Sequence, residues 1–331
     1  MQQKFTPRTL ILIGIVCGLL LATAFIAGCT SSTPATTAPV GTAAPSAPAS
    51  TPAAVETAAS APAPVATTAV PAATNAPSAA VTTTPKPVYT YSEGNVVAYT
   101  AASLAGVSPK LATDFEKMYP GHKVVFNLDG TQALKTQVQN GAYADVFISA
   151  SNAYTTELTK GGYFVTGTVK PLTSNYVIVI LPPNNPANIK SLADLAKPGV
   201  KIAMADKSVP VGTATAAVTA NIAKSTGFTQ AWNTSVYNNV VSFETSEPAV
   251  ASKVALGEVD AGFVYESTYI AGKDKYVAIS IPKAVNYLQT YTIGVMNQST
   301  SKGAAADFET FMLSDAGQND LKAYGFRAIS T

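Results

Sequence analysis

The sequence predicts one α/β domain with two lobes, in which a largely parallel sheet carries helices on both faces. Two observations predict this fold class. From residue 95 onward, short apolar segments alternate with segments whose apolar residues recur at helical spacing, which is typical of βαβ units. The pattern runs twice, and the continuously apolar segment 176–181 between the two runs is expected to be a fully buried central strand.

The first run predicts three strands, each followed by a helix. We expect strands at 95–100, 122–128 and 145–149, and helices at 108–118, 132–139 and 153–159. The helices end at Pro-Gly, Asn-Gly and Gly-Gly sequences, which are strong turn signals. Ser108 is expected to cap the first helix, with Pro109 at its first helical position.

The second run repeats this logic and then returns to the first. We expect strands at 201–205, 240–243 and 261–265, with helices at 191–195, 212–224 and 248–256. Segment 290–296 is predicted to be a strand that returns to the first lobe, before two closing helices at 304–313 and 317–323. Two lobes joined by crossing strands form a cleft, and ligands in such folds bind at the carboxyl ends of strands, on helix N-termini.

The N-terminus resembles the signal segment of secreted lipoproteins. Lys4 and Arg8 precede an apolar run over 10–27, and the run ends in Ala27-Gly28-Cys29, which resembles a lipobox. Residues 1–28 are therefore predicted to be removed, and Cys29 to carry the lipid. Two acyl chains hold a domain stably at a membrane, so we expect a lipid-anchored protein on the extracytoplasmic face of the cell membrane.

Residues 29–94 are expected to form a disordered tether between this anchor and the folded domain. They consist almost entirely of Ala, Thr, Pro and Ser, and such a segment cannot bury enough apolar surface to offset the entropy of ordering it. The chain has two cysteines. Because Cys17 lies in the segment expected to be removed and Cys29 is the anchor, the domain of residues 95–331 contains no cysteine.

Composition excludes several classes of chemistry for this domain. The formal net charge of the chain is +2, and only 12% of its residues are charged, so no basic surface for nucleic acid is expected. The single histidine, His122, follows a Pro-Gly turn, and no His or Cys cluster offers a metal cation site. There is also no P-loop or dinucleotide fingerprint. We expect no catalytic residues, no enzymatic activity and no cofactor.

Small polar residues remain at three junctions between a strand and a helix. They lie in segments 101–104, 129–132 and 209–213, the last directly before the longest expected helix. Each junction places backbone N–H groups and a hydroxyl where a helix dipole points outward. A protein can bind an anion in this way without using a cation.

At these residues the sequence is similar to a known family, the molybdate-binding proteins of ABC importers. The similarity is carried by segments 99–104, 141–150, 209–213, 256–265 and 324–326, in the same order and spacing. It implies the type II periplasmic-binding-protein fold, with a tetrahedral oxyanion held between lobe 1 (about 95–172 plus 288–331) and lobe 2 (about 173–287).

The resemblance also implies which residues bind the oxyanion. By motif, the hydroxyls fall on Ser103, Thr131 and Tyr265, and the backbone amides of the second lobe on Val211 and Glu247. Thr131 replaces the usual serine and keeps its hydroxyl.

Glu247 departs further from the family pattern, because it stands where the family usually has an apolar residue. We expect its carboxylate to point to solvent while its amide binds the ligand. Two alternatives stay open. One archaeal branch has a glutamate here that coordinates the metal centre, together with an aspartate where this chain has Val209. In the other alternative, Ser246 takes over the role.

The implied function is that of a monomeric receptor that captures molybdate or tungstate and delivers it to a membrane permease driven by an ATPase. Sulfate or another tetrahedral oxyanion is the first alternative. Two less favoured classes are an exported serine hydrolase that uses Ser103 or Ser149, which would need a base beside the serine, and an adhesin presented on the tether.

Overall fold

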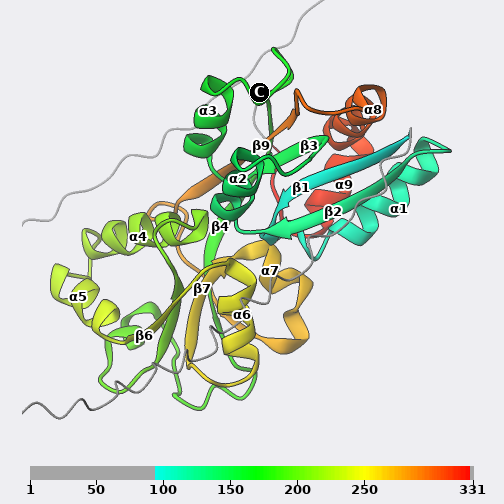
Figure 1. Cartoon of the computed structure of the whole chain (residues 1–331). Helices are drawn as coiled ribbons and strands as arrows, with labels where there is room; N and C mark the ends of the chain where they lie inside the picture. The colour runs from blue at the N-terminus through cyan, green and yellow to red at the C-terminus, as the bar shows by residue number, and fades with distance from the viewer. Residues whose placement is uncertain (1–93, 329–331) are drawn as a thin grey trace, which may run out of the picture. The chain divides into compact units, whose positions relative to one another are not determined.

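A computed structural model describes residues 94–328 of the chain, and Figure 1 shows their arrangement. The expected signal segment and lipidated Cys29 lie outside these residues, as does the expected tether apart from its last residue, Gly94. Within the part of the chain that is described, no helix has both the length and the apolar character needed to cross a membrane.

Three parallel strands form the sheet of each lobe. In the first lobe β1 (Asn95–Ala101) lies between β2 (Lys123–Asp129) and β3 (Val146–Ser149), in the order β2-β1-β3. In the second lobe β5 (Ile202–Ala205) lies between β6 (Val240–Glu244) and β7 (Ala261–Tyr265), in the order β7-β5-β6. Because the strands within each trio are parallel, their carboxyl ends lie at one edge of each lobe.

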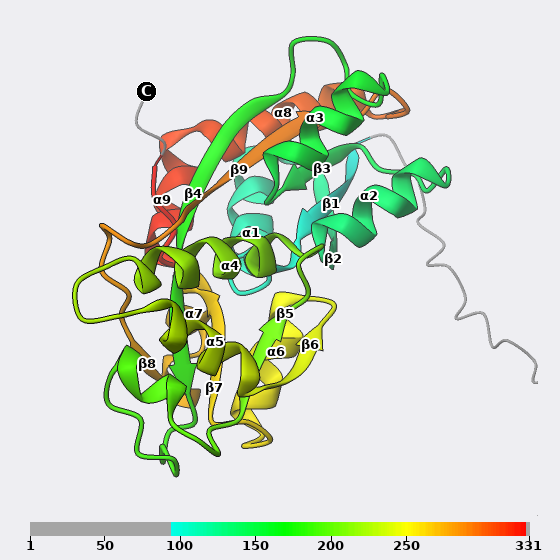
Figure 2. The ribbon, with the colours of Figure 1, turned by 90° about the vertical axis from the view of Figure 1, so that its left-hand side faces the viewer.

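Two long strands connect the lobes. β4 (Lys170–Leu181) and β9 (Leu288–Val295) pair antiparallel, from Lys170 opposite Ile293 to Tyr176 opposite Leu288, and Figure 2 shows them side by side. β9 continues onto β3, while β4 continues onto β7 and the short strand β8 (Val277–Ile279). The largely parallel sheet that we expected is therefore mixed, because both crossing strands run against their neighbours.

Helices cover both faces of this sheet, which has the path β2-β1-β3-β9-β4-β7-β5-β6. The first lobe carries η1 (Ala102–Leu104), α1 (Ser108–Met118), α2 (Thr131–Gln139), α3 (Asn152–Lys160), α8 (Lys302–Leu313) and α9 (Asp315–Ala323). The second lobe carries η2 (Leu192–Ala196), α4 (Pro210–Ala223), α5 (Gln230–Asn238), α6 (Glu247–Ala255), α7 (Glu266–Ala271) and η3 (Lys273–Lys275).

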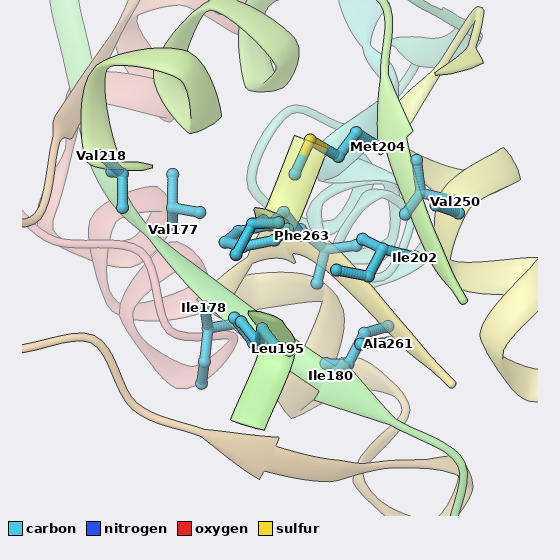
Figure 3. Packing of buried hydrophobic residues seen from close by; sticks show 14 of the residues in the cluster. Val177, Ile178, Ile180, Leu195, Ile202, Met204, Val218, Val250, Ala261 and Phe263 are labelled. Atoms are coloured by element: carbon cyan, nitrogen blue, oxygen red, sulfur yellow. The ribbon is translucent and has the colours of Figure 1, made fainter. Parts of the chain in front are cut away.

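Separate hydrophobic cores stabilise the two lobes. Phe263 of β7 lies at the centre of the second-lobe core, between β4, β5 and the surrounding helices (Figure 3). The first lobe has two clusters, one on each face of its sheet, and the larger includes Tyr291 of β9 and Phe308 of α8. The C-terminal helices α8 and α9 thus complete the core of the first lobe. The first strand of that lobe, β1, lies about two hundred residues earlier in the chain.

The expected cap of α1 is wrong. The N-cap residue is Val107, and Ser108 is already helical. The hydroxyl of Ser108 donates to the carbonyl oxygen of Leu104 at 2.9 Å instead of accepting from the helix. The reason is that η1 leads almost directly into α1, so a carbonyl from η1 lies within reach of the serine hydroxyl.

Candidate functional site

A small cavity of about 20 Å³ lies where the strand ends of the two lobes meet. Its lining comes from both lobes. The first lobe contributes Ala101, Ala102, Ser103, Gly130, Thr131 and Ala150, and the second contributes Val209, Pro210, Val211, Glu247 and Tyr265. All five residues expected to bind a ligand are therefore together. The lining contains no lysine or arginine, so any anion held here would be bound by dipoles and hydroxyls.

Three helices begin at the cavity. Thr131 is the first residue of α2, Glu247 is the first residue of α6, and Val211 is the second residue of α4. The first N–H groups of a helix have no acceptor within that helix. Since Pro210 has no N–H, Val211 offers the first amide of α4. Three positive helix ends therefore face one small space, which favours an anion.

Gly212 allows α4 to begin this close to the sheet. A Cβ atom at this position would lie 1.9 Å from the carbonyl oxygen of Asp206 and 2.6 Å from that of Ala205. Backbone atoms of this kind cannot move aside as a side chain can. Glycine at 212 therefore fixes the position of the neighbouring Val211 amide.

The first-lobe hydroxyls are held by hydrogen bonds within the protein. Ser103 Oγ lies 2.8 Å from the hydroxyl oxygen of Tyr291, which is fully buried in β9. Thr131 Oγ1 accepts from the backbone N–H of Ala150 at 3.2 Å. Accepting leaves the threonine proton available for an acceptor in the cavity.

The hydroxyl of Tyr265 is buried and has no hydrogen-bond partner among the described residues. Its ring packs edge-on against Tyr291, with 6.1 Å between the ring centroids. Burial, with the nearby Tyr291 and Glu247, raises the pKa of Tyr265 well above its ordinary value. The hydroxyl therefore stays protonated and can donate to a ligand at any physiological pH.

The expectation that the Glu247 carboxylate points to solvent is wrong, because this residue is only 3% exposed. Its Oε1 accepts from the backbone N–H of Tyr265 at 2.8 Å and from the hydroxyl of Thr268 at 2.6 Å. Burial raises its pKa to about 7, although both hydrogen bonds oppose this rise. The two donors at the junction of β7 and α7 draw the side chain inward.

Three other residues that the sequence singles out, Ser246, Ser149 and His122, do not line the cavity. Ser246 is the N-cap residue of α6 and does not line the cavity. Ser149 Oγ donates to the carbonyl oxygen of Ser151, and His122 pairs with Asp307. A serine hydrolase would require a base beside Ser103 or Ser149, and among residues 94–328 no hydrogen bond joins either hydroxyl to a His, Lys, Asp or Glu side chain. In the same residues no group of three or more His, Cys, Asp and Glu side chains could hold a metal ion.

Sequence reasoning missed two residues that support the site, Tyr291 and Thr268. Tyr291 holds the hydroxyl of Ser103, and Thr268 holds the carboxyl of Glu247. Because segment 290–296 has the pattern of a returning strand, its tyrosine could have been proposed as a buried polar residue. Nothing in the sequence around Thr268 distinguishes it from an ordinary surface threonine.

The fold and the cavity together define a solute-binding protein, with a ligand site between two lobes that are joined by two crossing strands. A family model described as "Bacterial extracellular solute-binding protein" matches residues 96–327. The chain belongs to this family.

Named relatives and solved structures agree with this assignment. The molybdate-binding protein ModA of Mycobacterium tuberculosis is 31% identical over 237 residues, which cover 72% of this chain and 86% of the relative. The periplasmic molybdate-binding protein of Azotobacter vinelandii has a TM-score of 0.61 and 22% identity, and the match covers 71% of this chain and all of that one. The sulfate-binding protein SubI of Mycobacterium tuberculosis has a TM-score of 0.63 and 19% identity, covering 72% and 88%. The predicted two-lobed periplasmic-binding-protein fold is confirmed.

Proposed function

We propose that this protein captures molybdate outside the cytoplasm and delivers it to the permease of an ABC importer. One observation carries the proposal, namely that the hydroxyl residues Ser103, Thr131 and Tyr265 and the helix starts at Val211 and Glu247 line one cavity without any cation. Five hydrogen bonds to a charged acceptor contribute about 3 kcal/mol each at the upper end of their usual range. They support sub-micromolar binding when the association cost lies near the lower end of about 4–15 kcal/mol.

The donor set favours a fully deprotonated tetrahedral anion. A protonated anion such as hydrogen phosphate would bring a proton against N–H and O–H donors, so it is disfavoured. Tungstate has nearly the size of molybdate and is expected to bind comparably. Sulfate is the second candidate, because the sulfate-binding protein SubI shares the fold. The identity in sequence is 31% to ModA of Mycobacterium tuberculosis and 25% to a sulfate-binding protein of Synechococcus elongatus, which supports molybdate over sulfate.

Hydrogen bonds between the lobes lie beside the cavity and support closure around the ligand. Gln132 Nε2, from α2, donates to the carbonyl oxygen of Thr245 at 2.7 Å. The hydroxyl of Tyr154, from α3, donates to the carbonyl oxygen of Ser208 at 2.6 Å. In this proposal lobe 1 comprises about 95–172 plus 288–331 and lobe 2 about 173–287. The crossing strands β4 and β9 then serve as the hinge.

We further infer that the receptor works as a single chain held at the membrane by a lipid. It acts as a monomer without a cofactor and performs no catalysis. Lipidation at Cys29 anchors it to the outer face of the membrane, and residues 29–94 give the binding domain reach toward the permease. Radiolabelled palmitate incorporation that disappears in Cys29→Ala would support the anchor, and labelling that persists would contradict it.

Isothermal titration of the purified domain with molybdate, tungstate, sulfate and phosphate tests the ligand assignment. We expect saturable binding of molybdate and tungstate at one site per chain, weaker binding of sulfate and none of phosphate. Binding of sulfate alone would reject the assignment to molybdate and favour the second candidate.

A further inference from the structure

One polar atom of the site has no role in the function proposed above, the second carboxyl oxygen of Glu247. Oε2 is buried and has no hydrogen-bond partner among the described residues. Glu247 also forms no ion pair there, since its contacts are the N–H of Tyr265 and the hydroxyl of Thr268, both on Oε1. A buried, ionised carboxylate with one bare oxygen is strongly unfavourable.

The two contacts on Oε1 determine where a proton can sit. Both are donors, so they occupy Oε1 as an acceptor and leave Oε2 as the oxygen that binds a proton. A carboxyl group protonated on Oε2 is neutral and has one O–H to donate. Nothing among residues 94–328 accepts it, although Glu247 lines the cavity. An oxyanion in that cavity would supply the acceptor.

We propose that Glu247 binds the oxyanion as a neutral carboxylic acid, donating its Oε2 proton to a ligand oxygen, so that ligand binding is coupled to proton uptake. This inference rests on the proposed function. In the ionised state the carboxylate would repel a dianion, whereas in the neutral state it adds a donor to the hydroxyls and amides. The proton comes from solvent and is shared in a hydrogen bond between Glu247 and the ligand. No covalent bond forms between the protein and the ligand.

The surroundings of Glu247 support a neutral group. The titratable side chains that face it are Tyr265 at the end of β7, Tyr276 after η3 and Tyr291 in β9, and its negative charge would raise the pKa of each. All three are neutral below their raised pKa values and so cannot compensate a carboxylate. Burial raises the pKa of Glu247 itself to about 7, so solvent protons near neutral pH can protonate it.

The proposal predicts a pH dependence with a definite sign. Below the pKa of Glu247 the free protein already carries the proton, and binding is insensitive to pH. Above it, each binding event must take up a proton, so the Kd for molybdate rises by up to about tenfold per pH unit. The site then binds dianions most tightly under mildly acidic conditions.

Titration calorimetry of the purified domain with molybdate, in buffers of different ionisation enthalpy at about pH 8, counts the protons taken up. We expect nearly one proton per molybdate for the unmodified protein and none for Glu247→Gln. The glutamine keeps an oxygen for Tyr265 and Thr268 and presents N–H donors in place of Oε2–H, so its Kd should stay within about threefold of the low-pH value. Glu258→Gln, an exposed glutamate of the same lobe, is the matched control and should behave like the unmodified protein.

Several outcomes separate failure of this inference from failure of the proposed function. Molybdate binding by the unmodified protein with no proton uptake, or with a Kd that falls as pH rises, would overturn the role of Glu247 and leave the molybdate function standing. No molybdate binding at any pH rejects the proposed function itself. If Glu247→Gln does not fold, the proton count of the unmodified protein alone decides.

Discussion

The two walls of the cavity are built differently. On the first-lobe wall, Ser103 and Thr131 each already have a hydrogen-bond partner, Tyr291 and Ala150. On the second-lobe wall, the hydroxyl of Tyr265 and Oε2 of Glu247 are buried without partners in the described chain. Each hydroxyl oxygen of the first wall thus already has a protein partner, whereas the second wall has polar atoms that only a ligand would satisfy.

Because of this difference, substitutions on the two walls should have different effects on folding stability and on ligand affinity. Removing a group from the first wall leaves a protein partner unsatisfied, so both folding and affinity suffer. Removing the unpartnered hydroxyl of Tyr265 from the second wall costs affinity alone, because the ligand-free protein loses no hydrogen bond. The following predictions test this separation.

The largest effect is expected from Gly212→Ala, which disturbs the second wall through its backbone. The new Cβ would meet the carbonyl oxygen of Asp206 at 1.9 Å, so the start of α4 must move and take the Val211 amide with it. We expect a loss of about 3 kcal/mol in the free energy of unfolding and loss of measurable molybdate binding. Chemical denaturation and calorimetry measure the two.

The matched control for this substitution is Gly303→Ala. Gly303 also lies in a helix, α8, and a Cβ there meets nothing within 4 Å. Alanine should therefore stabilise the protein by about 0.5–1 kcal/mol and leave binding unchanged. Equal behaviour of the two alanine variants would contradict the argument that backbone crowding requires a glycine at 212.

The second prediction concerns the stability of the ligand-free domain as a function of pH. Glu247 has a pKa of about 7 in the folded protein and an ordinary value of 4.5. The contribution of Glu247 to the free energy of unfolding is fully present below about pH 4.5 and is lost as the pH rises to about 7. The reason is that the Glu247 carboxyl loses its proton at a lower pH in the unfolded chain than in the folded protein. The loss should be about 3 kcal/mol relative to Glu247→Gln, measured by urea denaturation across this range. Parallel curves for the two proteins would mean that Glu247 is not buried as described.

The third prediction compares one hydroxyl from each wall. Tyr265→Phe should weaken molybdate binding at least about tenfold, since a hydrogen bond to a charged acceptor contributes about 1.5–3 kcal/mol, while the ligand-free melting temperature stays the same. Ser103→Ala should weaken binding similarly and also lower the melting temperature, because the buried Tyr291 hydroxyl loses its hydrogen bond to Ser103. Calorimetry and thermal unfolding of both variants provide the comparison.

A control for the tyrosine is Tyr237→Phe, which lies on α5 against the second-lobe core and should change neither quantity. If Tyr265→Phe destabilises the ligand-free protein as much as Ser103→Ala does, the proposed difference between the walls is wrong.

The smallest effect is expected at the contact between the lobes. Gln132→Ala removes the hydrogen bond to the carbonyl oxygen of Thr245 and should speed ligand release by about threefold, since one neutral hydrogen bond contributes about 0.5–1.5 kcal/mol. Gln139→Ala, on the same helix but bonded to Glu157 of its own lobe, is the control. Stopped-flow release rates that match for the two variants would argue against a closing role for Gln132.

Much of this site could be predicted from the sequence. Alternating apolar segments placed the strands, and the junctions after them placed Ser103, Thr131 and Val211 at strand ends, where parallel strands and helix starts meet. These are local features, fixed by hydrophobic periodicity and by turn residues such as Gly130 and Pro210. The resemblance to a known family added Glu247 and Tyr265, and all five residues line one cavity.

Other features depend on contacts between residues far apart in the chain. Helices α5 and α7 were not predicted. In α5 only Trp232 and Val236 are buried, and α7 follows β7 without a separating turn, so neither has a strong local signal. The antiparallel pairing of β4 with β9 likewise depends on two segments more than a hundred residues apart.

The sequence by itself determined that the cavity has no thiol chemistry, because the domain has no cysteine, and that imidazole and guanidinium groups are scarce, because it has a single histidine and a single arginine. That no lysine lines the cavity was decided by the tertiary structure. Only the tertiary structure decided the state of Glu247. Whether a carboxyl group faces solvent or is buried beside Tyr265 and Thr268 depends on how α6 packs against β7 and α7. That packing sets the local dielectric and the available donors, and therefore the charge of the group.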